Sequence, residues 1–286
     1  MSDNRLPADL DFIVAHALNE DIGSGDVTAQ LVDPAVRGRA RIVAREPAVI
    51  CGQAWVQAVF RMLQAPVRIE WTVAEGAQVA TDQVICLLSG PARTLLTGER
   101  CALNFLQTLS GTATTVRRYV DAVAGTGARI VDTRKTLPGL RNAQKYAVRC
   151  GGGVNHRLGL YDGILIKENH IAAAGGIRQA IHQARALGSS VPLMTEAETL
   201  DEARIALEED VDLLLVDDFS LPDIRSAVQM AREHRACGGK TLIEYSGGAT
   251  LETIRSLAET GVDRISVGSL TKHLRAIDLS MRFADD

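Results

Sequence analysis

The sequence predicts an α/β protein in which a compact β-rich module precedes a six-stranded parallel α/β barrel. Two observations support this fold class. A strand-then-helix pattern recurs from about residue 128 onward, whereas the first part of the chain has short β-like segments. Parallel strands are buried on both faces and therefore consist of nearly continuous apolar runs. Such runs, alternating with helices, are typical of βα units that close into a barrel.

Six apolar runs in the second part of the chain are predicted strands. Each run ends in polar or glycine residues, and the stretches between runs have apolar residues three or four positions apart, as in an amphipathic helix. The predicted strands lie in ARIVDTRK, DGILIKENH, VPLMTEAE, VDLLLVDD, TLIEYSGG and VDRISVGS. The predicted helices lie in LRNAQKYAVRC, IRQAIHQARAL, TLDEARIALEE, LPDIRSAVQMAREH and TLETIRSLAET.

The first 110 residues predict a helix and several short strands in place of repeated βα units. The helix lies in LDFIVAHALNE, and the β-like segments lie in RARIVARE, VRIEWTVAEG and QVICLLSG. A long helical stretch, RTLLTGERCALNFLQTLSGTATTVRRYVDAVAG, then leads toward the barrel. We place the domain boundary inside this stretch, which gives domains 1–110 and 111–274. We also expect a C-terminal helix after residue 270, with residues 275–286 returning to the first domain.

Composition and charge argue against several classes of protein. The net charge of −4 does not suggest wholesale nucleic-acid binding. No apolar run approaches the roughly 18 residues of a membrane span, and the start, MSDNRLPADLDF, lacks the order of a signal peptide. The five cysteines are widely spread without a CxxC pair. This pattern argues against a disulfide framework or a zinc site and favours a reducing cytoplasm.

Charged residues, serines and glycines stand at the carboxyl ends of the predicted strands, where the active sites of such barrels lie. They are Arg134, Lys135, Lys167, Glu196, Asp217, Ser246, Gly247, Gly248, Ser266 and Gly268. Residues 129–167 hold eight Lys or Arg and two acids. A positive zone in an acidic protein suits the capture of a small anion. Three of these cations are spaced four residues apart and would share one face of a helix: Arg141, Lys145 and Arg149. That face could equally be a solvated basic surface.

These groups together suit a ligand that carries phosphate, pyrophosphate and a sugar. The cation pairs Arg134–Lys135 and His156–Arg157 can bind carboxylates or a pyrophosphate. The carboxylates at 196 and 217 can hold Mg²⁺ or face a positively charged sugar. The SGG and SVGS segments can bind phosphate through backbone N–H groups. Phosphoribosyl pyrophosphate is a ligand that would use every one of these parts.

Most of these residues also have a purely structural interpretation. Glu196 could be an acid in the first turn of a helix, and Asp217 could be a helix N-cap. His156 could be a buried structural histidine, and Arg100 a residue on a helix surface. The SGG and SVGS segments could be helix starts with serine caps. Lys167 ends an apolar run, where a bare surface lysine is unexpected, so a functional role explains it better.

Seven motifs, in order over nearly the whole chain, resemble the quinolinate phosphoribosyltransferase family. They are ALNEDIGSGDVT (17–28), TGERCALNFLQTLSGTAT (97–114), DTRKTLPGLR (132–141), KYAVRCGGGVNHRLGLYDGILIKENH (145–170), LVDDFS (215–220), EYSGG (244–248) and ISVGSLTKH (265–273). The resemblance implies an N-terminal α/β sandwich domain joined to an open barrel, in a homodimer with shared active sites. It also implies conversion of quinolinate and phosphoribosyl pyrophosphate, with Mg²⁺, to nicotinate mononucleotide, pyrophosphate and CO₂ in de novo NAD biosynthesis.

The resemblance assigns substrate-binding roles to several residues. Arg134, His156 and Arg157 match positions that bind the two carboxylates of quinolinate. Arg100 matches a residue that completes the site of the partner subunit. The positions that match the family's phosphate loops are Ser246, Gly247, Gly248, Ser266 and Gly268.

The resemblance assigns catalytic roles to two lysines and two carboxylates. Lys135 and Lys167 match lysines at the substrate and the pyrophosphate, while Glu196 and Asp217 match the carboxylates near the ribose and the metal. Three other positions depart from the family pattern. They are Met194 in place of a carboxylate, Asp218 in place of the Asn of an LDN motif, and Leu137 in place of Thr. None belongs to the cation set, so the activity is still expected.

Three other functions remain open at this point. The chain also resembles a molybdenum-transport-associated protein of related fold, although the DTRKTLPGLR and IKENH segments favour the quinolinate enzyme. Lys135 or Lys167 could form a Schiff base, as in barrel aldolases. Borohydride trapping would reveal such an adduct. The basic cleft could also belong to an anion sensor, which would bind phosphoribosyl pyrophosphate without turnover.

Overall fold

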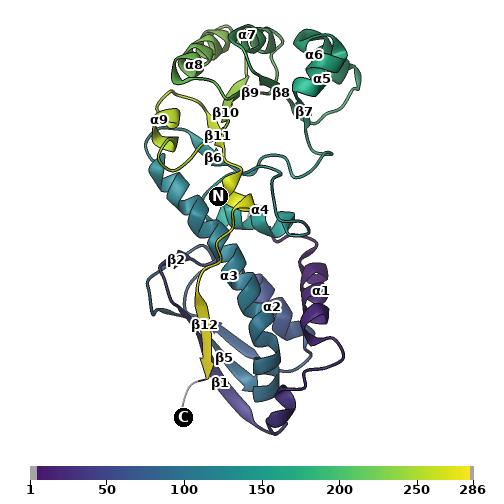
Figure 1. Ribbon diagram of the computed structural model, residues 1–286, viewed down its shortest axis with the longest axis vertical. Helices are drawn as coiled ribbons and strands as arrows, with labels where there is room; N and C mark the ends of the chain where they lie inside the picture. The colour runs from purple at the N-terminus through teal and green to yellow at the C-terminus, as the bar shows by residue number, and fades with distance from the viewer. Residues whose placement is uncertain (1–4, 284–286) are drawn as a thin grey trace. The chain divides into compact units, whose positions relative to one another are not determined.

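The computed structural model describes residues 5–283 and joins the six predicted strands in one parallel sheet (Figure 1). The strand order is β6-β11-β10-β9-β8-β7, so β6 and β7 are the two edges and the barrel is open. A single parallel bridge joins Val131 of β6 to Val154, ahead of β7. The strands are β6 (Arg129–Val131), β7 (Ile164–Ile166), β8 (Leu193–Ala197), β9 (Leu213–Asp217), β10 (Leu242–Ser246) and β11 (Arg264–Ser266).

Helices cover one side of this sheet, and in Figure 1 α5 to α8 form a row there. The apolar residues of α8 recur with helical spacing and are buried at Ile224, Ala227, Val228 and Ala231. Ser220 caps this helix by accepting the backbone N–H of Asp223. The helices are α5 (Glu168–Ala174), α6 (Ile177–Ala186), α7 (Leu200–Glu208), α8 (Leu221–Ala236) and α9 (Ile254–Ala258).

A separate antiparallel sheet of order β12-β1-β5-β3 is built from the first part of the chain and its C-terminal end. In this sheet β1 pairs with both β5 and β12, with Ile42 opposite Cys86 on one side and Met281 on the other. Two short strands, β2 and β4, form a further antiparallel pair. The bounds are β1 (Arg37–Ala44), β2 (Ala48–Val49), β3 (Arg68–Trp71), β4 (Gln78–Val79), β5 (Val84–Pro91) and β12 (Leu279–Phe283).

The antiparallel sheet shares one apolar core with the helices around it. Trp55 and Phe60 of α2, with Leu103 and Leu106 of α3, are among its fully or almost fully buried side chains. The helical segments are α1 (Leu10–Ile22), a 3₁₀ turn (Ala29–Leu31), α2 (Gln53–Met62), α3 (Ala92–Ala122), α4 (Arg141–Cys150) and α10 (Ser269–Lys272). The expected long helix that follows the first-domain strands in the sequence is therefore confirmed as α3.

The described residues fall into two compact units. The first contains residues up to 117, 136–152 and those from 270 onward, and the second contains 118–135 and 153–269. The domain boundaries 1–110 and 111–274 remain a prediction, and residues 1–4 and 284–286 lie outside the described part. Within residues 5–283, no helix is both long and apolar enough to cross a membrane.

The α/β class, the first module and the six parallel strands are confirmed, whereas the expected C-terminal helix is wrong. After the short helix α10, the chain forms strand β12, which pairs with β1. The segment LSMRF is short, and its β conformation depends on hydrogen bonds to a strand more than 200 residues earlier. Local periodicity could not reveal that pairing.

Candidate active site

The parallel sheet brings the predicted charged residues to a single edge. Neighbouring parallel strands end on the same side, so side chains at or just beyond their carboxyl ends lie around one mouth. Arg134 and Lys135 follow β6, Lys167 follows β7, Glu196 lies near the end of β8, and β9, β10 and β11 end at Asp217, Ser246 and Ser266. All of these residues belong to the second compact unit.

Lys167 and Glu196 form an ion pair, with 2.6 Å between Nζ and Oε1. The lysine side chain is 43% exposed and the glutamate side chain 10%. Burial raises the pKa of Glu196, the Lys167 ammonium lowers it, and the nearby charge of Asp217 raises it again. Glu196 lies inside strand β8, not in the first turn of a helix, so that structural alternative is wrong.

Arg134 and Arg157 lie close enough for their charges to repel. Burial lowers the pKa of Arg157, and the charge of Arg134 lowers it further, while Asp162 and Glu196 oppose this shift. The guanidinium of Arg157 is fixed by a 3.0 Å hydrogen bond from Nη1 to the carbonyl of Gly163. Two cations held this close favour an anionic group between or beside them.

His156 is buried among protein groups. Its Nδ1 accepts the backbone N–H of Arg157 at 2.7 Å, which assigns the ring proton to Nε2. That nitrogen lies 3.8 Å from Oε1 of Glu244, and the side chain is 8% exposed. The backbone N–H of His156 donates to Asp132 at 2.8 Å. These contacts agree with the alternative that His156 is a buried structural histidine. A contact between His156 and the substrate remains a prediction.

Glu244 and Asp132 are buried carboxylates to which the sequence analysis gave no role. Burial raises the pKa of Glu244 to about 7, although the charge of Arg264 opposes the shift. Arg264 Nε lies 2.8 Å from Glu244 Oε2, yet within the described chain neither carboxylate oxygen receives a well-aligned hydrogen bond. An acid inside the apolar strand LIEYS was the available signal, because a lone acid in such a run must face a polar interior.

The predicted phosphate segments differ in their local structure. Gly247 has φ of +152°, and an added Cβ would lie 2.5 Å from the Tyr245 hydroxyl, so glycine is required there. An added Cβ at Gly248 would meet no atom within 4 Å. The SGG segment does not start a helix directly, since α9 begins at Ile254. Ser266 donates to the carbonyl of Tyr245 at 3.2 Å and caps no helix.

Lys135 reaches the neighbouring strand end. A Cβ added to Gly268 would lie 3.0 Å from Cδ of Lys135, so the lysine stem passes directly over this glycine. This contact follows from the pairing of β6 with β11. Gly268 therefore leaves room for a cation beside the SVGS segment, as expected for a site that takes phosphate groups.

The structure shows how two of the residues that depart from the family pattern fit their positions. Met194 is buried with Leu213 and Leu215 in a small apolar cluster, so an apolar side chain is accommodated there. Asp218 has a left-handed backbone with φ of 54°, a conformation that Asp and Asn tolerate best after Gly. Asp217 ends β9, and Ser220 caps the next helix, so Asp217 is not the N-cap.

The remaining predicted cations belong to the first compact unit. Arg100 is exposed on α3, which agrees with a helix-surface residue, and its role in a partner's site remains a prediction. Arg141, Lys145 and Arg149 lie on α4, where Lys145 is fully buried. A solvated basic face is therefore wrong for Lys145.

Comparisons with known proteins identify the family. The sequence profile of the quinolinate phosphoribosyl transferase C-terminal domain matches residues 112–282, and that of the N-terminal domain matches residues 26–110. The chain belongs to the quinolinate phosphoribosyl transferase family. The resemblance drawn from the motifs is thus confirmed.

Similar proteins cover the chain almost completely. A nicotinate-nucleotide pyrophosphorylase (carboxylating) of Mycobacterium leprae is 42% identical and aligns over 98% of this chain and 99% of its own length. A quinolinate phosphoribosyltransferase (decarboxylating) of Nicotiana glauca is 34% identical over 96% of this chain and 82% of its own. The structure of the nicotinate-nucleotide pyrophosphorylase from Francisella tularensis is 43% identical, covers 98% of both chains and superposes with a TM-score of 0.93.

Proposed function

We infer that this protein transfers the phosphoribosyl group of phosphoribosyl pyrophosphate to quinolinate, releasing pyrophosphate and CO₂ and giving nicotinate mononucleotide for NAD biosynthesis. Family membership over nearly the whole chain supports this reaction. One structural observation carries it: Arg134, Lys167 and Glu196 all lie at the carboxyl edge of the parallel sheet, where Lys167 Nζ and Glu196 Oε1 are 2.6 Å apart. Cations and an acidic group therefore lie at one mouth of the sheet, as a dicarboxylate and a sugar phosphate together require.

We propose that Arg134 and Arg157 bind the two carboxylates of quinolinate. Guanidinium groups bind carboxylates through paired hydrogen bonds, and the second carboxylate relieves the repulsion between the two cations. His156 is proposed in the same site. Its Nδ1 accepts the Arg157 N–H, and its other nitrogen faces Glu244, so the geometry supports a role in holding Arg157 in place.

We propose that Glu196 and Asp217 hold Mg²⁺. They are hard oxygen donors, and their charges are close enough to interact. Mg²⁺ usually binds through one or two carboxylates together with substrate phosphates, so the donor set fits this ion. When bound, Mg²⁺ would supply positive charge to the departing pyrophosphate.

The chain's own residues can stabilise both products of bond breaking at the ribose. Departure of pyrophosphate leaves a sugar with cationic character and a strongly anionic leaving group. Lys135 and Lys167 are proposed to stabilise the anion, and Glu196 and Asp217 the cation. The 2.6 Å contact with Glu196 orients the Lys167 side chain. Ser246, Gly247, Gly248, Ser266 and Gly268 are proposed to bind the ribose 5-phosphate.

Loss of CO₂ follows from the charge of the ring. Once the pyridine nitrogen has attacked the ribose, the ring is positively charged and can hold the electrons left by the departing carboxylate. No electron sink supplied by the protein is then needed. A Schiff-base function for Lys167 is disfavoured, because its Nζ is already engaged by the carboxylate of Glu196.

The reaction is tested by product analysis of the purified protein. Quinolinate labelled at the carboxylate next to the ring nitrogen is mixed with phosphoribosyl pyrophosphate and Mg²⁺, with nicotinate replacing quinolinate in a parallel sample. We expect CO₂ and nicotinate mononucleotide in equal amounts from quinolinate alone. Tight binding of phosphoribosyl pyrophosphate without product would instead indicate a sensor or the transport-associated branch.

We also propose a homodimer in which Arg100 completes the partner's site, because its position in the GER motif matches that role in the family. Mixed dimers give the test. Arg100→Ala and Lys135→Ala should each be inactive alone, whereas a mixture should regain activity because one composite site is intact. No recovery in a verified mixed dimer would show that Arg100 does not act across the interface.

We further propose a cytoplasmic location. All five cysteines are free thiols, which fits a reducing compartment. Fractionation of cells that express the untagged chain would test this location, and recovery of the protein in a membrane or periplasmic fraction would contradict it.

A further inference from the structure

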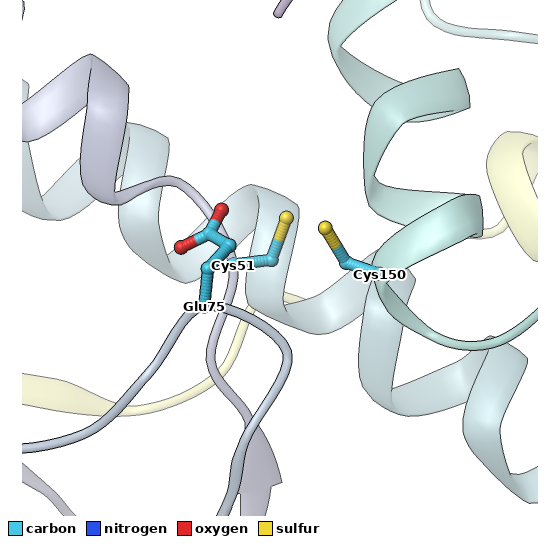
Figure 2. Close-up of side chains that lie close together, drawn as sticks. All are labelled: Cys51, Glu75 and Cys150. Carbon is cyan, nitrogen blue, oxygen red and sulfur yellow. The ribbon is translucent and has the colours of Figure 1, made fainter. Parts of the chain in front are cut away.

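The first compact unit contains a cluster of two cysteines and one glutamate that the reaction does not use. Cys51, Glu75 and Cys150 each offer one ligand atom, and these atoms lie within 4.8 Å of one another. Figure 2 shows the two thiols pointing toward each other with the Glu75 carboxylate beside Cys51. In the part of the chain that the structure describes, this is the one group of three or more His, Cys, Asp or Glu side chains with metal-ligand spacing.

We propose that Cys51, Glu75 and Cys150 form a structural binding site for a thiophilic divalent cation, Zn²⁺. Two thiolates and a carboxylate are ligands that Zn²⁺ accepts, and water can take the fourth tetrahedral position. Binding forms two Zn–S bonds and one Zn–O bond, and the two S–H protons pass to solvent. The sequence argued against a zinc site because no cysteines stand close together along the chain; the fold supplies the proximity.

The spacing suits a metal better than a direct bond between the sulfurs. Zinc–sulfur bonds of about 2.3 Å in a tetrahedron place two sulfurs roughly 3.8 Å apart. A disulfide requires two sulfurs about 2.05 Å apart and would not involve the carboxylate. Ligand atoms that all lie within 4.8 Å need only a small contraction around Zn²⁺.

The carboxylate of Glu75 is held in place before any metal binds. Its two oxygens accept backbone N–H groups at the start of α2, from Gly52 at 2.8 Å and Gln53 at 3.2 Å. The carboxylate thus lies at the positive end of the helix. Hydrogen bonds of this kind orient metal ligands in known sites, and each carboxylate oxygen keeps a further lone pair for a cation.

Both cysteines are fixed by the surrounding backbone. Cys51 is fully buried, and its N–H and carbonyl both bond to the Ser110 hydroxyl, at 2.9 and 3.2 Å. Cys150 is the last residue of α4, where the negative end of the helix dipole favours a cation. The turn after Glu75 lies close to this helix end, since a Cβ added to Gly76 would lie 3.3 Å from the Cys150 carbonyl oxygen.

The test uses the full-length protein after dialysis against a chelator, with Zn²⁺ alone as the probe. We expect one tightly bound zinc per chain, measured by metal analysis after desalting and by competition with a chromophoric chelator. Cys51→Ser, Cys150→Ser and Glu75→Gln should each weaken binding by at least about 100-fold, beyond the 10- to 100-fold typical of residues that only orient ligands. Cys86→Ser, a buried thiol outside the cluster, and Cys237→Ser, an exposed one, should bind like the wild type.

Two measurements on the wild type keep the proposal falsifiable if a variant fails to fold. Co²⁺ should give a thiolate-to-metal charge-transfer band, and Zn²⁺ should slow alkylation of Cys51 and Cys150 but not of the exposed Cys237. Zinc binding that persists in Cys51→Ser and Cys150→Ser would overturn the assignment. The proposal would also be overturned if Co²⁺ gave no charge-transfer band and Zn²⁺ gave no protection from alkylation. This includes the outcome in which peroxide oxidises Cys51 and Cys150 to a disulfide and the protein does not bind Zn²⁺.

Discussion

The interior of the first compact unit and the interior of the second unit around Glu244 are both buried, but they bury different groups. Around Trp55 and Phe60 the first unit packs apolar side chains against one another. Around Glu244 the second unit places a fully buried carboxylate beside His156 and Arg264, and within residues 5–283 neither carboxylate oxygen receives a well-aligned hydrogen bond. Apolar burial stabilises a fold, whereas buried charge costs stability and is usually retained for function. We therefore expect stability to depend mainly on the first region and catalysis on the second.

The largest expected effect on stability is that of Trp55→Ala. The side chain is fully buried and its ring lies 5.3 Å from that of Tyr146. Its removal should lower the free energy of unfolding by about 3–5 kcal/mol, as is typical of large-to-small changes in a core. Denaturant unfolding gives the value, with Leu187→Ala as a control, since Leu187 is 73% exposed. If Trp55→Ala lowered the free energy of unfolding by less than about 1 kcal/mol, stability would not depend mainly on the core of the first unit.

The largest expected effect on catalysis in the second region is that of Lys167→Met. It removes one charge from the site but retains most of the length of the side chain. We expect kcat/KM to fall about 100- to 1,000-fold, the usual effect of losing a group that stabilises developing charge. The free energy of unfolding should change by less than about 1 kcal/mol, because the lysine is partly exposed. Lys240→Met, at an exposed position, is the control. Unchanged kcat/KM in Lys167→Met would remove this lysine from the mechanism.

A smaller and pH-dependent effect is expected for Glu244→Gln. The folded-state pKa of about 7 is higher than the 4.5 of an exposed glutamate, so folding favours the protonated acid. The stabilising contribution of this group is present at low pH and is lost as pH rises from about 4.5 toward 7. One pKa unit corresponds to about 1.4 kcal/mol. Between pH 5 and pH 7 the wild type should therefore lose about 2 kcal/mol of stability relative to Glu244→Gln.

The check is the free energy of unfolding of both proteins measured at several pH values. Glu233→Gln, which changes an exposed residue of α8, should follow the wild type at every pH. Parallel curves for the wild type and Glu244→Gln would show that this carboxyl group titrates normally and that its burial carries no cost.

The sequence predicted the parts of the fold that local pattern determines. Six apolar runs and the long helix α3 were found because their periodicity is strong. Helix α2 was missed because QAWVQAVFRM is rich in Trp, Val and Phe, which favour strands as much as helices. The sequence predicts a helix where strand β12 lies, because the conformation of that segment is set by pairing with β1. Tertiary contacts decide such segments.

The same distinction applies to the functional residues. Charges at strand ends are visible in the sequence because strand ends can be counted, so Lys167 and Glu196 were found. The buried polar groups that contact residues distant in the chain were not. Glu244 and Asp132 contact residues distant in the chain, and Cys51 meets Cys150 only through the fold. A buried polar network depends on three-dimensional proximity, and one sequence does not contain that information directly.

The central claim is that the carboxyl ends of the parallel strands form a site for a dicarboxylate. The most direct measurement is calorimetric titration of the wild type and of Arg134→Ala with quinolinate, nicotinate and phosphoribosyl pyrophosphate. We predict that the wild type binds quinolinate far more tightly than nicotinate. Arg134→Ala should weaken quinolinate binding about 10- to 100-fold, as expected for a lost charged hydrogen bond, with little change for phosphoribosyl pyrophosphate. Equal affinity for quinolinate and nicotinate, or an equal loss for both substrates in the variant, would contradict the claim.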